Sequence, residues 1–282
     1  MSDYDLYYWS VPLRGQFVRA ILAFAGKSWT ERGDNAILRL MHGPVERMPV
    51  PFMGAPVLVD HATGISIAQT PAIVLYLGET LNLLPTEPYR KAMAIKVMND
   101  SNDVIDELTL SGGRQMWTKE SWREFTPRLI PIRENADWYA RGVGGAAARE
   151  IKALCQPATC LEESINWRAG IRKWMSLWEE TGRRHHLSAQ SGFLLGETNP
   201  GIADIVTTIL WSPLIERFPT IGPILQETAP NTFGLIHRMD ALPPLKALAA
   251  KARGEYGNTW CGGEIEASLR MVLEDNTSQP EG

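Results

Sequence analysis

Residues 55–81, APVLVDHATGISIAQTPAIVLYLGETL, decide the fold of this chain, because their hydrophobic pattern changes from strand to helix. Two short apolar runs, 56–60 and 65–67, flank a turn that ends at Gly64, which predicts a β-hairpin. The apolar residues of 70–81 then recur at helical spacing, which predicts a helix. The residues on its apolar face are Ile73, Val74 and Leu77. A hairpin that leads directly into a helix indicates a small α/β unit.

The residues before this stretch extend the same unit toward the N-terminus. Residues 5–9 are aromatic and apolar, which predicts a buried strand, and residues 17–24 show a helical repeat that Gly26 ends. Residues 28–32 predict a second strand, so the predicted order is β-α-β-(α)-β-β-α. A helix between two strands implies a parallel crossover, and the closing hairpin makes the sheet mixed.

Strand patterns stop after the α/β unit, and amphipathic helical patterns follow it. These patterns cover residues 90–110, 161–181, 201–217 and 243–256. The prolines within 85–88 predict a linker between an α/β domain, 1–84, and a helical domain, 89–274. The polar residues 275–282 predict a frayed tail.

One segment of the helical part does not continue this pattern. Residues 121–130 and 172–181 have the pattern of two pieces of one helix, and the forty or so residues between them are long for a connection in a compact domain. Residues 131–171 therefore predict an insertion. The other interpretation is one more helix pair with a long loop.

Composition narrows the class of protein. The chain has 282 residues, of which 44% are hydrophobic and 21% are charged, which argues against full-length disorder. The formal net charge of −4 argues against a nucleic-acid partner, because nucleic-acid-binding domains usually carry a basic face. The N-terminus lacks the basic and apolar regions of a signal peptide, and no apolar run approaches 18 residues. We therefore expect a cytoplasmic protein with no membrane partner.

The chain contains three cysteines, Cys155, Cys160 and Cys261. In a reducing cytoplasm they are expected to be free thiols, although Cys155 and Cys160 are close enough in sequence for a local bridge or half of a metal site. No histidine or cysteine lies near them at the spacing of zinc ligands, so we expect no metal.

Four segments carry the functional signal: YWSVPLRG (8–15), APVL (55–58), QTPAI (69–73) and GETNPGIAD (196–204). Together they resemble the cytosolic glutathione transferases of bacterial type, without assigning a class. The resemblance covers residues 5 to about 256, apart from the predicted insertion. It implies a thioredoxin-like α/β domain with a mixed four-stranded sheet, followed by an all-α domain.

The first segment resembles the place where these enzymes activate a thiol. A free thiol is mostly protonated at neutral pH, and the thiolate is the nucleophile. A hydroxyl that donates to the sulfur stabilises the thiolate, and a helix N-terminus assists it. The resemblance implies Tyr8, but two extra residues separate Tyr8-Trp9 from Arg14-Gly15, and Ser10 resembles the position of the serine-type classes. Both hydroxyls remain candidates.

The other segments resemble the binding site for glutathione. The resemblance implies that Pro56 follows a cis bond and that Ala55 binds the tripeptide through its main chain. It also implies that Gln69 and Thr70 bind the γ-glutamyl carboxylate at a helix start, with Thr70 as the N-cap and Pro71 as the first helical residue. Weaker candidates by the same resemblance are Arg14, Arg47 and Asp103, the last across a dimer interface.

The fourth segment has a structural role in this interpretation. Gly201 takes the N-cap position of a helix in the second domain, and Asp204 is expected to accept a hydrogen bond from the cap N–H.

The resemblance implies an enzyme that joins the thiolate of glutathione, its co-substrate, to a small hydrophobic electrophile held between the domains. It also implies a homodimer. Two alternatives stay open, namely a glutathione-dependent isomerase or lyase of the same fold, and a non-catalytic glutathione-binding or ligand-carrier protein.

Overall fold

The computed structural model describes residues 2–109, 116–118 and 168–274. Most of the predicted insertion at 131–171 lies outside these ranges, as do the helix piece 121–130, Cys155, Cys160 and the tail 275–282. Residues 168–171 belong to a helix.

The N-terminal part contains a four-stranded sheet with helices between its strands. Its elements are β1 (Tyr4–Tyr7), α1 (Leu13–Phe24), β2 (Trp29–Arg32), α2 (Asp34–Met41), η1 (Val45–Arg47), β3 (Val57–Asp60), β4 (Ser66–Ala68) and α3 (Thr70–Thr80). The strand order is β2-β1-β3-β4, with β1 parallel to β2 and with β1–β3 and β3–β4 antiparallel. The predicted mixed sheet and its closing hairpin are confirmed.

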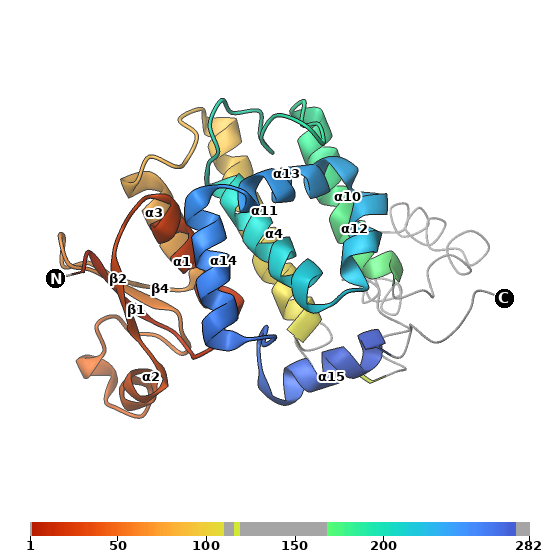
Figure 1. The fold of residues 1–282 in the computed structure, drawn as a ribbon. Helices are drawn as coiled ribbons and strands as arrows, with labels where there is room; N and C mark the ends of the chain where they lie inside the picture. Colours follow the sequence, from red (N-terminus) through yellow and green to blue (C-terminus); the bar gives the residue numbers. More distant parts are fainter. Residues whose placement is uncertain (1, 110–115, 119–167, 275–282) are drawn as a thin grey trace, which may run out of the picture.

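The sheet is held to the rest of the molecule by α1 and α3, which lie on the same face (Figure 1). Leu6 of β1 pairs with Leu58 of β3, and both side chains are almost fully buried. Phe17 and Ile21 of α1 belong to the same core, which continues into the helical part. The short apolar strands are therefore buried by the helices that follow them in sequence.

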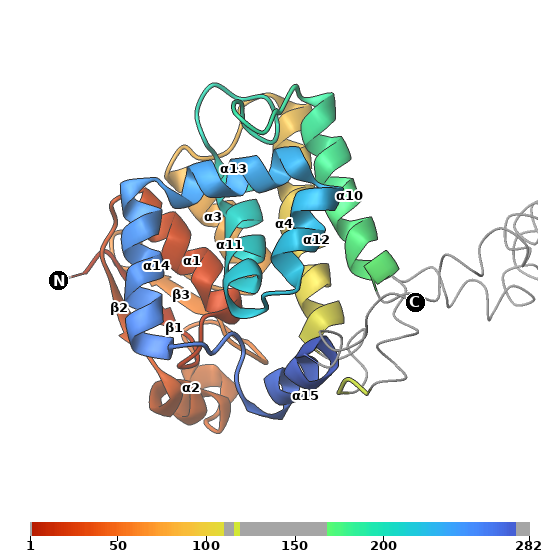
Figure 2. The ribbon, with the colours of Figure 1, turned by 45° about the vertical axis from the view of Figure 1, so that its right-hand side comes forward.

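The helical part consists of α4 (Pro88–Thr109), α10 (Arg168–Arg184), α11 (Ile202–Arg217), α12 (Ile221–Thr228), α13 (Pro230–Asp240), α14 (Pro243–Tyr256) and α15 (Gly263–Glu274). In Figure 2, α11 runs through the middle of this group, and it packs against α4, α13 and α1. The sequence patterns predicted α4, α10, α11 and α14 but not α12, α13 or α15. No described helix is long and apolar enough to cross a membrane.

The start of α11 joins the two parts of the chain. The Asp204 carboxylate accepts the N–H of Gly201 at 2.9 Å and that of Leu194 at 2.7 Å, which confirms the predicted cap. Burial raises the pKa of Asp204 to about 6. A Cβ atom at Gly201 would lie 2.7 Å from the Leu83 carbonyl oxygen, which also accepts the N–H of Ile202. This close approach explains why glycine takes the cap position.

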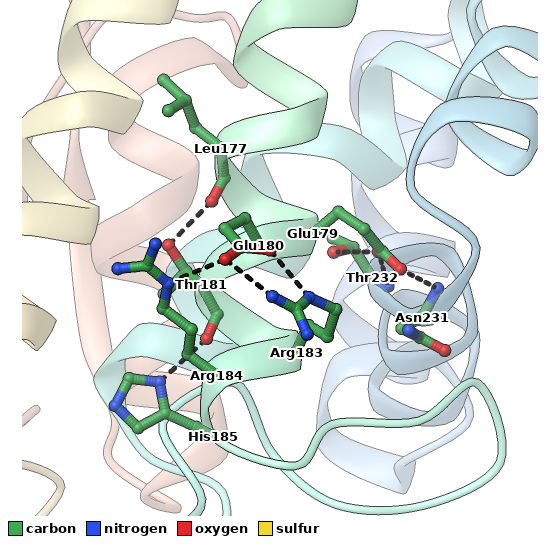
Figure 3. Close-up of polar contacts among 9 residues, drawn as sticks. All are labelled: Leu177, Glu179, Glu180, Thr181, Arg183, Arg184, His185, Asn231 and Thr232. Atoms are coloured by element: carbon green, nitrogen blue, oxygen red, sulfur yellow. Dashed lines mark hydrogen bonds and ion pairs between the residues drawn. The ribbon is translucent and has the colours of Figure 1, made fainter.

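Helices α10 and α13 are joined by a carboxylate at a helix start (Figure 3). Glu179 accepts the backbone N–H groups of Asn231 and Thr232 at 3.2 and 3.0 Å and the Thr232 hydroxyl at 3.1 Å. These are N–H groups of the first turn of α13, where a negative charge is favourable. The adjacent Glu180 pairs instead with Arg183 and Arg184 of its own helix. Glu179 therefore links two helices, whereas Glu180 forms surface pairs within one.

Candidate functional site

The loop between β1 and α1 brings a tyrosine hydroxyl to the start of a helix. Tyr8 lies just after β1 and is 3% exposed. Its Oη accepts the backbone N–H of Arg14 at 3.0 Å. A Cβ atom at Gly15 would lie 2.3 Å from the Tyr8 ring, so glycine is required for this approach. Of the two neighbouring tyrosines, Tyr8 is the one that contacts the first turn of α1.

The surroundings of Tyr8 keep its phenol protonated. Burial raises the pKa of Tyr8, and the Arg14 guanidinium and the N–H groups of Arg14 and Gly15 oppose this only in part. Because Oη accepts a bond from the main chain, its own proton is available for donation to a further group. The arrangement can therefore stabilise an anion next to the helix start.

A tight turn absorbs the two extra residues of this loop. The Val11 N–H donates to the Trp9 carbonyl at 2.8 Å, which closes a three-residue turn. Arg19 of α1 donates to the carbonyls of Val11 and Pro12 at 3.2 and 3.4 Å and pairs with Glu31 of β2 at 2.7 Å. The turn and the arginine allow Tyr8 to reach Arg14 despite the longer spacing.

Arg19 is a positioning residue that sequence reasoning missed. Arg19 is 3% exposed, and its guanidinium carbon lies 5.6 Å from the centre of the Tyr8 ring and equally far from that of Tyr256. The available signal was an arginine within the apolar run 17–24, since a buried cation needs a partner.

Ser10, the other candidate hydroxyl, is placed differently from Tyr8. Ser10 is exposed, and its backbone N–H donates to Asp34 at 2.8 Å. Its Oγ lies 3.8 Å from the position of a Cβ atom at Gly33. Ser10 therefore lies beside the start of α2, whereas Tyr8 lies beside the start of α1.

The start of α3 differs from the prediction by one residue. Gln69 is the N-cap, because its carbonyl accepts the Ile73 N–H at 3.0 Å. The backbone of Gln69 has a φ of 74°, which is unusual for a residue other than glycine. The expected N-cap role of Thr70 is wrong, because this turn of the chain makes Thr70 the first helical residue. Its hydroxyl is buried and has no hydrogen-bond partner among the described residues.

The Ala55–Pro56 peptide bond is cis, as the resemblance implied. It lies directly before β3, where Val57 pairs with Ala68 of β4. Extending this antiparallel register brings residues 55–56 to the level of 69–70. The register therefore places these four candidates at the same end of the β3–β4 pair.

The weaker candidates lie at separate places. The Arg14 guanidinium turns toward α4, where it donates to Asn102 at 3.1 Å and pairs with Asp106. Asp103 is half-buried on the same helix, and Arg47 is exposed in η1. Arg14 therefore contributes its main chain at Tyr8 and its side chain at α4.

The described residues include one cysteine near this site and no metal cluster. Burial, reinforced by Glu266, raises the pKa of Cys261 to about 12, so its thiol is protonated at neutral pH. Within the described residues, no group of three or more His, Cys, Asp or Glu side chains is arranged to hold a metal ion.

Comparison with known proteins identifies the family. The family model described as "Glutathione S-transferase, C-terminal domain" matches residues 93–141 and 161–272, more than half of the chain. The chain belongs to the glutathione S-transferase family. The gap in the match, residues 142–160, falls within the predicted insertion. None of the curated proteins matches this chain.

Solved structures share the fold of this member of the family at low sequence identity. NaGST-2 is 17% identical with a TM-score of 0.56, and the match covers 89% of this chain and 97% of NaGST-2. The structure described as monomeric Na-GST-3, from the hookworm Necator americanus, is 16% identical with a TM-score of 0.56 over 88% and 96%. Prostaglandin synthase D of Nilaparvata lugens is 16% identical with a TM-score of 0.50 over 88% and 97%. These likenesses confirm the predicted two-part fold.

Proposed function

We propose that this glutathione S-transferase joins the thiolate of glutathione to a small hydrophobic electrophile. The observation that carries the proposal is the buried Tyr8 phenol, whose Oη accepts the Arg14 N–H at the start of α1 and retains its own proton. A protonated phenol at a helix N-terminus favours a nearby anion.

In the proposed reaction, Tyr8 donates its O–H to the glutathione sulfur and holds it as a thiolate. With an aromatic halide, the sulfur attacks the ring carbon that carries the halogen. A carbon–sulfur bond forms, the carbon–halogen bond breaks, and the halide leaves with the bonding electrons. The thiol proton passes to solvent before the attack. Ser10 is the alternative donor, and its exposed position beside α2 makes it the weaker one.

The proposed place for the rest of glutathione is the end of the β3–β4 pair where residues 55–56 and 69–70 lie. The main chain of Ala55 before cis-Pro56 is proposed to pair with the cysteinyl part. The start of α3 is proposed to bind the γ-glutamyl carboxylate, with the Gln69 amide and the Thr70 hydroxyl as added partners. The unpartnered Thr70 hydroxyl supports this assignment, because a buried hydroxyl normally has a partner. Arg14, Arg47 and Asp103 stay weaker candidates for the same ligand.

The proposed domain division assigns glutathione to residues 1–84 and places the second substrate between them and residues 89–274. Clefts between domains are frequent ligand sites. We further propose a cytoplasmic detoxification role and a homodimer. Light scattering tests the proposed dimer, and a monomer in solution would contradict it. The similar Na-GST-3 is described as monomeric.

Two measurements test the proposed function. Calorimetry with reduced glutathione should show binding, and a panel of aromatic halides, epoxides and unsaturated carbonyls should show turnover that depends on glutathione. Binding without turnover on the panel would favour the non-catalytic binder. Turnover without a conjugate, detected as a rearranged or cleaved product, would favour the isomerase or lyase. No heat of binding and no turnover would refute the proposal.

A further inference from the structure

The connection between α14 and α15 contacts the loop that carries Tyr8. We refer to residues 258–262 as the strap. The Trp260 carbonyl accepts the Leu13 N–H at 3.2 Å. A Cβ atom at Gly262 would lie 3.3 Å from Val11 Cγ1, and Gly262 has a φ of 73°. Figure 2 shows the connection leaving the end of α14 and leading into α15, which packs against α4.

Trp260 anchors the strap in the core. It is 3% exposed, and its ring packs perpendicular to that of Phe218, with ring centres 5.8 Å apart. The same tryptophan lines a small void with residues of three helices: Leu13 and Phe17 of α1, Ile105 of α4, and Leu210 of α11. The strap is therefore fixed at the junction of the sheet-bearing part and the helical part.

A single buried carboxylate sets the shape of the strap. Glu266 of α15 is 6% exposed, and its Oε2 accepts the backbone N–H groups of Trp260, Cys261 and Gly262 at 2.8, 2.9 and 2.7 Å. Its Oε1 accepts Arg270 Nε at 2.8 Å. Although burial favours the neutral acid, these N–H groups and Arg270 hold the pKa of Glu266 below its usual range.

Arg270 binds the opposite end of the strap. Its Nη2 donates to the Asn258 carbonyl at 2.7 Å, and its Nη1 donates to the Arg217 carbonyl at 3.2 Å. The Glu266–Arg270 pair thus holds both ends of the strap, one through N–H groups and the other through a carbonyl.

The strap and the Tyr8 phenol each accept a hydrogen bond from the first turn of α1. The Leu13 N–H is bound by the Trp260 carbonyl, and the next N–H, that of Arg14, is bound by Tyr8 Oη. Leu13 has a φ of 24°, so this turn begins in a conformation that residues other than glycine rarely adopt. A contact that holds Leu13 therefore also fixes where the Arg14 N–H meets the phenol.

We propose that Glu266 is a positioning residue for thiol activation, because it shapes the strap whose Trp260 carbonyl holds the first turn of α1 against Tyr8. The proposal rests on the proposed function, in which Tyr8 stabilises the thiolate. The alternative is that Glu266 only stabilises α15, in which case its loss lowers the melting temperature without changing the ionisation of bound glutathione.

The test compares Glu266→Gln with the wild type through the pH profile of kcat/KM for an aromatic halide. The apparent pKa of the bound thiol should rise by about one unit. Because only the thiolate reacts, a rise of one unit lowers the thiolate fraction about tenfold below the pKa, so kcat/KM should fall about tenfold at pH 6.5. The loss should shrink as alkaline pH ionises the thiol without assistance. The KM for glutathione should stay within about twofold.

Two further variants make the result specific. Glu264→Gln makes the same chemical change on the exposed side of the same helix and should keep the wild-type profile. Gly262→Ala leaves Glu266 intact but pushes the strap away from Val11, and it should move the thiol pKa in the same direction. If Glu266→Gln fails to fold by circular dichroism, Gly262→Ala decides the outcome.

Tyr8→Phe in the same assay separates the two hypotheses. If wild type lowers the thiol pKa and Tyr8→Phe abolishes this, but Glu266→Gln and Gly262→Ala follow the wild-type profile, the positioning role is refuted and the proposed function stands. If wild type neither binds glutathione nor lowers its thiol pKa, both proposals fail, because there is no thiolate to position.

Discussion

The first turns of α1 and α3 are both proposed to face glutathione, but they differ in how their polar groups are hydrogen-bonded. At α1, Tyr8 Oη and the Trp260 carbonyl bind two successive backbone N–H groups. At α3, the cap residue Gln69 has a positive φ, and the buried Thr70 hydroxyl has no partner among the described residues. At α1 the protein supplies partners for both N–H groups, whereas at α3 one buried hydroxyl has no partner among the described residues.

This difference matches the two ends of the proposed ligand. The sulfur must meet a donor that is already oriented, since preorganised donors give the largest electrostatic effect on a reacting atom. The γ-glutamyl carboxylate takes no part in the proposed reaction and only has to bind, so the groups at the start of α3 can remain unpartnered until it does. Unpartnered buried groups and unusual backbone conformations lower stability and are concentrated at functional sites. The comparison therefore predicts opposite responses to mutation at the two helix starts.

The largest effect is expected for Tyr8→Phe, which removes the proton donor at α1. The value of kcat/KM with an aromatic halide should fall about 100-fold at neutral pH, which is typical for the loss of one such donor. Because the pKa of Tyr8 is raised, its ionisation should not reduce wild-type activity below about pH 10. Ser10→Ala is the matched control and should retain activity. The reverse pattern would identify Ser10 as the donor.

Gly15→Ala tests how tightly α1 packs on Tyr8. The added Cβ would lie 2.3 to 2.9 Å from three ring atoms, so thermal unfolding should show a loss of about 2 kcal/mol, as overpacking typically causes. At Gly54 a Cβ would meet nothing within 4 Å. Gly54→Ala should therefore leave stability almost unchanged, and equal losses in the two variants would argue against a tight ring contact.

Thr70→Val tests whether the unpartnered Thr70 hydroxyl at the start of α3 binds a ligand. The variant replaces an unpartnered hydroxyl with a methyl group, so the free protein should gain about 1 kcal/mol in stability. Glutathione should bind about tenfold more weakly, because one hydrogen bond to a charged group is lost. Thr80→Val, at the exposed end of the same helix, is the control for binding. Weaker binding without any gain in stability would mean that the hydroxyl has a partner in the free protein.

The smallest effect is expected for Gln69→Gly. Glycine adopts a positive φ without strain, so the variant should gain about 1 kcal/mol or less in the free energy of unfolding. Ala68→Gly changes the neighbouring strand residue, where glycine has no such advantage, and should lower stability instead. Glutathione affinity should fall several-fold in Gln69→Gly only. A loss of stability in both variants would show that the Gln69 conformation is not strained.

The sequence predicted those parts of the fold that depend on local pattern. Alternating and helical repeats located the hairpin, α1, α3 and the long helices, because each buries one continuous apolar face. Helices α12 and α13 were missed because they are short and separated by Ala229 alone. Helix α15 was missed because it begins at Gly263, directly after Gly262, and two successive glycines are typical of a loop.

The candidate site was predictable only where a motif lies in one segment. Tyr8 and the start of α3 followed from such motifs, although the cap of α3 falls on Gln69 and not on Thr70. Arg19 and Glu266 were missed because their roles depend on groups distant in sequence or on main-chain atoms. A carboxylate that binds three backbone N–H groups leaves no pattern in the residues it contacts.

The placement of Arg19 gives the outer strand an influence on the proposed chemistry. Its buried guanidinium is neutralised by Glu31 of β2 while it holds the carbonyls of Val11 and Pro12. Any event that removes or covers the Glu31 carboxylate would leave a buried cation without its counter-charge, directly beneath the phenol. The outer strand β2 is thus electrostatically connected to the Tyr8 phenol through the single side chain of Arg19.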